Sequence, residues 1–420
     1  MVLDIEQRAL MAEDGERFSL LLAGEPRTPL FRPTVFSIAM RRSAGLAANT
    51  LVRDDGALMH LLLWADIQEI DLEGRFARGE FLTPVEVQSF ARATKQSLRQ
   101  LRSTRPTPVR RPSLSAGTEQ FRSPSVASKS GVRSATSGYK LWLAGKYLDW
   151  LAGDTAPPVG HDGSTTARSE AKRTMLDAIA AQLTKFNGPA GVPREGLTEA
   201  QQDLLREVIR PSSPSNPWRH PFVRVRNQAI VEFVLAEGTR RGEALKQAIS
   251  DIDFAGYLIS VVRRPDDPTD SRVREPNVKR AGRVLPMGEP LADILSDYIV
   301  NWRSAIPAAR LHDVLFVNKD GAPLSKESVQ KLFSTIRKKI PGFPKQLTTH
   351  LLRHTWNDNF SMHMDANRVP PEHEVRDRSY LMGWSEHSGS AARYTTRSTR
   401  KRANAHSLKM QTANGSKVKK

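Results

Sequence analysis

Hydrophobic residues recur at helical spacing through much of the first half of the chain. One series begins at Asn49 and continues at leucine and isoleucine positions, namely Leu51, Leu58, Leu61, Leu62, Leu63 and Ile67. Residues 82–87 are typical of a helix start, with a threonine cap, a proline and a glutamate that closes a capping box. Helical patterns resume at Tyr139–Leu151 and Ala167–Leu183. Together they predict a helical domain over residues 30–187.

Two segments of this half lack that pattern. Residues 1–29 are mixed and acidic-leaning, and we expect them to form a loose lead-in. Residues 103–137 are rich in Ser, Pro and Arg and carry six basic side chains against one acidic side chain. Such a segment buries too little to fold alone. It is predicted to be a flexible basic loop, either tracking a phosphate backbone or serving as a solvated linker.

The second half predicts a separate, mainly helical domain with a small sheet. Pro189, Gly191 and Pro193 indicate a hinge before it, and Val223–Ala236 has the pattern of a helix that ends at Gly238. Two predicted strands, joined by a long polar loop, are Gly256–Arg263 and Gly282–Pro286. A helix opens at Leu197, and further helices are expected at about 290–303, 325–339, 347–362, 372–382 and 389–397.

Composition narrows the class of protein. The 420 residues carry a net charge of +18, which favours a polyanionic partner over a merely solvated basic surface. The absence of cysteine excludes disulfides, a thiol nucleophile and cysteine-ligated zinc. Acidic residues interrupt the N-terminus, and no apolar run is long enough to cross a bilayer. We therefore expect a cytoplasmic protein without a membrane partner.

Three motifs carry the chemistry. They are Gly238–Leu245 (GTRRGEAL), His350–Thr355 (HLLRHT), and Gly383–Trp384 followed by Arg393–Thr395 (RYT). In this order they supply two arginines, a histidine and a late tyrosine, which suit the transfer of a phosphodiester from DNA to a side chain. The chain resembles the tyrosine recombinase, or phage integrase, family over about residues 197–400.

The resemblance implies a mainly α fold. It comprises a helical core-binding domain and an α-rich catalytic domain with a small antiparallel sheet. Here these are assigned to residues 30–187 and 197–400, with a basic tail at 401–420. In the family the two domains form a clamp around duplex DNA. The first half matches by position and pattern rather than by motif.

Arg240 and Arg353 are the candidate phosphate clamps. Guanidinium groups match two phosphate oxygens and stay charged at working pH. Glu243 is expected to orient Arg240 or to close the turn. Arg241 stands where the family has an aliphatic residue and receives no role in the site.

Tyr394 is the candidate nucleophile. A free phenol ionises near pH 10, so it needs nearby cations or a base. Tyr380 is its nearest rival, but it precedes Trp384 and is expected on the core side of its helix. Trp384 stands where the family has His or Trp, although Tyr394 follows it by ten positions, one more than usual. Either the intervening loop has an extra residue, or His387 takes the place of Trp384.

His350 lies three positions before Arg353 and shares its helix face. It is expected to accept the proton of Tyr394 or to hold a phosphate oxygen. His354 follows His350 by four, which is also a zinc-site spacing, but Leu351 replaces the glutamate that such a motif needs. We therefore expect His354 to be a buried structural histidine.

Lys279 is the candidate general acid. It is the sole lysine between Lys246 and Lys319 and precedes Arg283–Pro286 (RVLP). The family places its leaving-group acid in this hairpin, before a similar motif. The alternative is an exposed hairpin charge.

Taken with the family resemblance, these residues predict a site-specific DNA recombinase or integrase, which the resemblance implies forms a 3′-phosphotyrosyl intermediate and needs no ATP, metal or other cofactor. Its expected partners are double-stranded DNA, three further copies of the chain in a synaptic tetramer, and an accessory DNA-bending protein. The alternatives are a type IB topoisomerase-like enzyme and a non-catalytic DNA-binding protein of integrase fold. A metal-dependent nuclease using Glu243, Asp251 and Asp253 is less favoured, because these carboxylates crowd one turn.

Overall fold

A computed structural model describes residues 3–103, 132, 134–156, 164–186, 195–278, 282–385, 389–392, 394, 403–404 and 407–410. The chain divides into two compact units. Unit 1 comprises Met1–Ala12 and Arg17–Ala190, and unit 2 comprises Glu13–Glu16 and Gly191–Lys420. The predicted hinge residues Pro189–Pro193 lie outside the described ranges.

Unit 1 begins with an antiparallel sheet, so the expectation of a loose lead-in was wrong. Its strands are β1 (Glu6–Met11), β2 (Arg17–Ala23) and β3 (Thr28–Pro29), in that order across the sheet. Leu21 and Ile5 are 1% and 2% exposed and belong to the hydrophobic core of the unit. The segment folds because these residues pack on helices far along the chain, which its local composition does not reveal.

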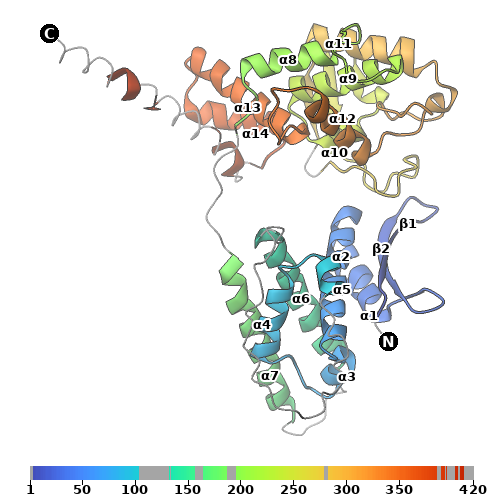
Figure 1. Cartoon of the computed structure of the whole chain (residues 1–420), viewed down its shortest axis with the longest axis vertical. Coiled ribbons are helices and arrows are strands. Elements are labelled where there is room, and N and C mark those ends of the chain that lie inside the picture. Colours follow the sequence, from blue (N-terminus) through green and yellow to red (C-terminus); the bar gives the residue numbers. More distant parts are fainter. Residues whose placement is uncertain are drawn as a thin grey trace, which may run out of the picture. The chain divides into compact units, whose positions relative to one another are not determined.

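Helices make up most of the other described residues of unit 1 (Figure 1). They are α1 (Phe31–Val35), a π-helical segment (Phe36–Arg42), α2 (Ala48–Ile67), α3 (Leu72–Ala77), α4 (Pro84–Ala93), α5 (Leu98–Ser103), α6 (Ser134–Asp154), α7 (Ser164–Leu183) and a 3₁₀ turn (Thr184–Phe186). The predicted capping box of α4 is confirmed, since Glu86 N–H donates to Thr83 Oγ1 at 3.3 Å and Thr83 N–H donates to Glu86 Oε2 at 2.8 Å. Of the predicted basic loop, residues 104–131 and 133 lie outside the described part.

Unit 2 is also mainly helical (Figure 1). Its helices are α8 (Glu199–Ile209), α9 (Pro221–Glu237), α10 (Arg241–Lys246), α11 (Glu289–Asp297), α12 (Lys326–Lys339), α13 (Thr349–Ala366) and α14 (Pro371–Met382). A π-helical segment (Tyr298–Arg303) continues α11, and 3₁₀ turns occupy Ile249–Asp251 and Pro307–Leu311. The antiparallel sheet has the order β4 (Ile252–Asp253), β5 (Leu258–Val261) and β6 (Arg283–Pro286). The predicted fold class, helical with small antiparallel sheets, is confirmed.

Helix α9 is the centre of unit 2. Ala229, Ile230, Phe233 and Val234 are at most 1% exposed and pack in the core with residues of α11, α12 and α13. The helix ends at Gly238, whose φ of +58° lies in the left-handed region that favours glycine. A side chain there would also approach Trp356 to 2.7 Å. This turn delivers the first arginine motif to the end of α14.

The segment between β5 and β6 is fastened to α10 by buried charges. Lys246 Nζ donates to Asp267 Oδ2 at 3.1 Å, to Asp270 Oδ2 at 3.2 Å and to Glu275 Oε2 at 2.9 Å. Arg272 donates to Asp270 and to the carbonyl oxygens of Leu245 and Leu324. Lys279 follows this segment and lies outside the described residues.

Candidate active site

Arg240 stands at the N-terminus of α10, where Glu243 holds it. The Glu243 carboxylate accepts from the Arg240 backbone N–H at 3.0 Å and from its Nη1 at 2.6 Å. The same Nη1 lies 3.4 Å from the carbonyl oxygen of Met382, the last residue of α14. The Arg240 side chain is still 26% exposed, so part of its guanidinium remains available to a ligand.

Glu243 is shared by three arginines. Besides Arg240, Arg283 Nη2 donates to its Oε2 at 3.0 Å, and Arg353 Nη1 lies 4.0 Å from the same oxygen. Burial acts to raise the pKa of Glu243, but the charges of Arg283 and Arg240 outweigh it and hold that pKa below its usual range. A buried, ionised carboxylate therefore anchors the arginine cluster.

Arg353 projects from α13 and is 4% exposed. Its Nη1 donates to the Gly238 carbonyl at 2.7 Å, and its Nη2 donates to the Met382 carbonyl at 3.0 Å. Burial, aided by the charge of Arg240, lowers the pKa of Arg353 to about 9, which leaves the guanidinium protonated at neutral pH. Arg240 and Arg353 thus meet at the Met382 carbonyl, where α10, α13 and α14 converge.

Tyr394 is brought to this cluster by two contacts. Its ring stacks on Trp384, with centroids 5.7 Å apart and an interplanar angle of 12°. The Arg353 guanidinium lies 5.3 Å from the Trp384 ring. The Tyr394 hydroxyl lies 2.8 Å from Nδ1 of His354. The imidazole accepts this hydroxyl hydrogen in the tautomer that carries its own proton on Nε2.

The expectation that His354 is a buried structural histidine was wrong. His354 is half-buried and contacts the Tyr394 hydroxyl, whereas His350 is exposed. The two imidazole rings touch, with centroids 4.5 Å apart. His354 lies one position after Arg353, so its side chain turns to the neighbouring helix face, from which Tyr394 approaches.

Tyr380 also differs from its expectation. It is 60% exposed, and its hydroxyl lies 3.4 Å from the Val284 carbonyl, so it does not point into the core. Met382, two positions later, is fully buried instead. Lys279 and His387 both lie outside the described part of the chain.

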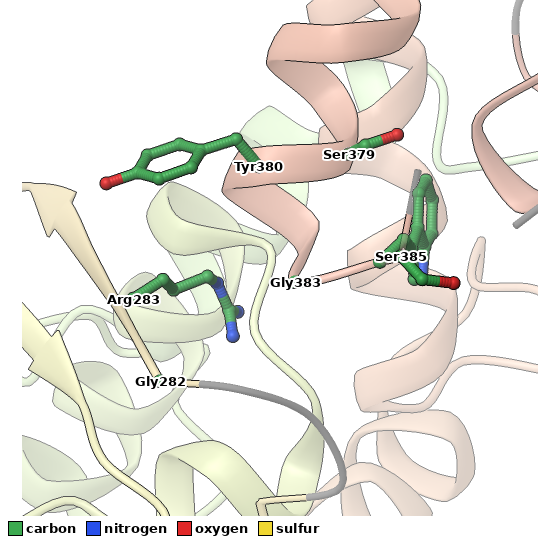
Figure 2. A pocket seen from close by; sticks show the side chains of 7 residues that line it. Gly282, Arg283, Ser379, Tyr380, Gly383 and Ser385 are labelled. Atoms are coloured by element: carbon green, nitrogen blue, oxygen red, sulfur yellow. The ribbon is translucent and has the colours of Figure 1, made fainter. Parts of the chain in front are cut away.

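Arg283 also belongs to the arginine cluster, although the sequence motifs did not assign it a role. It is 7% exposed, and its Nε donates to the Leu381 carbonyl at 2.7 Å. A cavity of about 310 Å³ lies beside it, lined by Gly282, Arg283, Ser379, Tyr380, Gly383, Trp384 and Ser385 (Figure 2). Gly383 has φ +60°, and a side chain there would lie 2.8 Å from Arg283 Nη1. The RVLP motif could have indicated this residue, but not its partner Glu243.

Comparisons with known proteins test the family resemblance. The model of the phage integrase family matches residues 220–401. This part of the chain belongs to the phage integrase family. The family resemblance inferred from the three motifs is thereby confirmed.

The relatives cover part of the chain. Tyrosine recombinase XerD of Halalkalibacterium halodurans is 28% identical over 164 residues, which are 39% of this chain and 48% of the relative. The XerD of Corynebacterium glutamicum is 27% identical over 187 residues, which are 43% of this chain and 54% of the relative. The chain therefore spans about half the length of the curated relatives it matches.

A solved structure resembles the chain over a longer range. The Tn1549 transposon integrase, in a complex with transposon right end DNA, matches with a TM-score of 0.50 and 14% identity. The match covers 88% of this chain and 99% of that chain. At this identity the likeness concerns the fold. Within the described residues, the helices are too short or too polar to cross a membrane.

Proposed function

We propose that the chain is a tyrosine-type site-specific DNA recombinase or integrase. The observation that carries the proposal is the placement of Tyr394, stacked on Trp384 beside the Arg240–Glu243–Arg353 cluster, with its hydroxyl on His354. A phosphodiester seated on the two arginines would lie next to this phenol. The family match over residues 220–401 supports the same reading.

In the proposed reaction, the Tyr394 oxygen attacks the scissile phosphorus and a 3′-phosphotyrosyl bond forms. The bond to the 5′-oxygen breaks, and this oxygen leaves with a proton, for which Lys279 remains the candidate donor. Arg240 and Arg353 balance the charge of the non-bridging oxygens. His354 is positioned to take the phenol proton, and His350, exposed beside it, is proposed to hold a phosphate oxygen. Attack by the 5′-hydroxyl of a second strand reverses the step.

The proposed partner is double-stranded DNA. The net charge of +18 supports it, and so do the relatives and the integrase–DNA complex that the chain resembles. Unit 1 is proposed to bind the duplex together with unit 2. Strand exchange between two duplexes requires four active sites, so a tetramer on DNA is proposed, with a DNA-bending protein as an accessory partner.

The experiment uses a nicked suicide substrate, from which the strand beyond the cleavage site is lost. Wild-type protein should form a covalent adduct that survives denaturing electrophoresis, and Tyr394→Phe should bind the DNA without forming it. An adduct from the Phe variant would move the nucleophile elsewhere, with Tyr380 the next residue to test. Joining of two different duplexes distinguishes a recombinase from a topoisomerase-like enzyme, which relaxes supercoils without exchange.

A further inference from the structure

A buried arginine outside the phosphate cluster contacts the candidate nucleophile. Arg378, on α14, is 0% exposed, and its guanidinium carbon lies 5.5 Å from the centroid of the Tyr394 ring. It also lies 5.0 Å from the ring of Phe360 on α13. The cation is thus in contact with two aromatic rings, a geometry that attracts it to their faces.

Polar groups of α13 and α14 hold this guanidinium in place. Nη1 donates to the backbone carbonyl of Asn357 at 2.9 Å and to its side-chain oxygen at 3.1 Å. Nη2 donates to Ser361 Oγ at 2.6 Å and to the carboxylate of Glu374. Ser361 Oγ in turn donates to Glu374 Oε1 at 2.9 Å. The charge therefore occupies a fixed position between α13 and α14, and the Tyr394 ring lies against it.

The guanidinium is not fully satisfied by these partners. Its Nε is buried and has no hydrogen-bond partner among the described residues. An arginine that served merely to tie α13 to α14 would be expected to pair its buried donors, since an unpaired donor is costly. Glu374 offsets part of the positive charge, and the remainder acts on the aromatic ring that covers it.

We propose that Arg378 is a positioning residue for Tyr394, holding the phenol ring in place and favouring the phenolate as the hydroxyl loses its proton. The proposal rests on the proposed function, in which Tyr394 is the nucleophile. Among the described residues, the charged and titratable groups that face Tyr394 include His354 and Arg353 from α13 and Arg378 from α14, and the carboxylates of Glu374 and Asp358 act on Arg378 itself. His354 takes the proton, while the two arginines stabilise the negative charge that remains.

The expected size follows from the position of the guanidinium against the ring that carries the ionising hydroxyl. An opposite charge about 4–6 Å away changes the pKa of a group by about 1–3 units. Because Glu374 neutralises part of the charge, the lower end applies, which corresponds to about a tenfold change in the phenolate fraction at neutral pH. The effect disappears at a pH at which the phenol is ionised in both proteins.

The test removes the Arg378 charge without leaving the Glu374 carboxylate buried and lacking its ion-pair partner. Arg378→Met alone leaves the Glu374 carboxylate buried and unpaired, so the variant to compare is the double substitution Arg378→Met with Glu374→Gln. Glu374→Gln alone is the matched control, because it keeps the guanidinium. The rate of adduct formation on the suicide substrate is measured across pH for both proteins, and their thermal midpoints are recorded.

The double variant should be at least about tenfold slower than Glu374→Gln at neutral pH, because neither protein has the Glu374 charge that offsets Arg378, and it should approach the control as the pH rises. A second measurement avoids DNA. The ultraviolet phenolate absorbance of Tyr394, obtained by subtracting the matching Tyr394→Phe protein, should appear at higher pH in the double variant. Equal slowing at every pH, with an unchanged phenolate titration, would overturn the proposal and leave Arg378 a structural tie. An adduct from Tyr394→Phe would instead overturn the proposed function itself.

Discussion

Nη1 of Arg240 lies 2.6 Å from Oε1 of Glu243, and this contact joins a partly exposed arginine to a carboxylate that is fully buried. The arrangement explains why an acidic residue stands in a site built for a phosphate. The carboxylate lies behind the guanidinium groups and fixes their direction, while the exposed edge of Arg240 is left for a ligand.

Glu243→Gln should therefore lower the free energy of unfolding. Breaking a buried ion pair costs about 3–5 kcal/mol, and the value here should fall at the lower end because the amide oxygen keeps one hydrogen bond. The folded-state pKa of Glu243 is depressed, so its contribution is present above the unfolded value of about 4.3 and is lost as the pH falls through the folded value. Urea unfolding of both proteins should show a difference that shrinks in acid. A difference independent of pH would mean that the carboxylate charge does not matter.

Arg240→Ala should slow cleavage by about 10²–10³-fold, because it removes a donor aimed at the transition-state charge. The loss of DNA affinity should be much smaller. Single-turnover cleavage and equilibrium binding measure the two effects separately. Arg241→Ala is the matched control, since it removes an adjacent positive charge to which no site role is assigned. Equal slowing in both variants would reduce Arg240 to a steering charge.

His354→Ala and His350→Ala should change the pH dependence of the cleavage rate in different ways. Loss of a proton acceptor costs about 10²–10⁴-fold in rate, and His354 is the histidine in contact with the Tyr394 hydroxyl. His354→Ala should therefore flatten the rise of the cleavage rate with pH, because only the neutral form of an imidazole accepts a proton. His350→Ala should lower the rate with the rise retained. The reverse pattern would return the proton-acceptor role to His350.

The contrast between the two histidines shows which features of the site could be predicted from the sequence. Spacing along α13 places His350 and Arg353 on one face, and the motifs identify the family. Neither shows from which side Tyr394 approaches, because that depends on the turn at Gly383 and on packing between α13 and α14. Arg378 was missed for the same reason, since its partners Asn357 and Ser361 lie 21 and 17 positions away. Strand β1 was missed because its residues, EQRALM, do not alternate between apolar and polar.

Lys279→Ala should be slow on the natural DNA and recover on DNA with a bridging 5′-sulfur. A thiolate leaves without a proton, so the general acid is no longer needed. The same pair of substrates is applied to Arg240→Ala, which should stay slow on both because the phosphate charge is unchanged. Equal slowing of Lys279→Ala on the two substrates would place the acid elsewhere, with His350 the first alternative.

Lys246→Met should also slow cleavage of natural DNA with recovery on the sulfur substrate, but less than Lys279→Ala does. The effect should arise because Lys246 holds the segment that precedes Lys279. The ammonium joins α10 to Asp267, Asp270 and Glu275, and the last two carboxylates are at most 1% exposed. Burial acts to raise the pKa of Asp270, but Arg272 and Lys246 outweigh it and lower that pKa to about 2, so all pH values used for cleavage leave it charged. Without Lys246, Asp267 and Glu275 lose their shared cation while Asp270 keeps Arg272, so the free energy that holds the segment closed should fall by about 3–5 kcal/mol and local opening should become more frequent. Hydrogen exchange over residues 263–278 should rise, and cleavage of the oxygen substrate should fall with partial recovery on the sulfur substrate. Normal exchange in this segment together with slow cleavage of both substrates would show instead that Lys246 acts through α10 and Arg240.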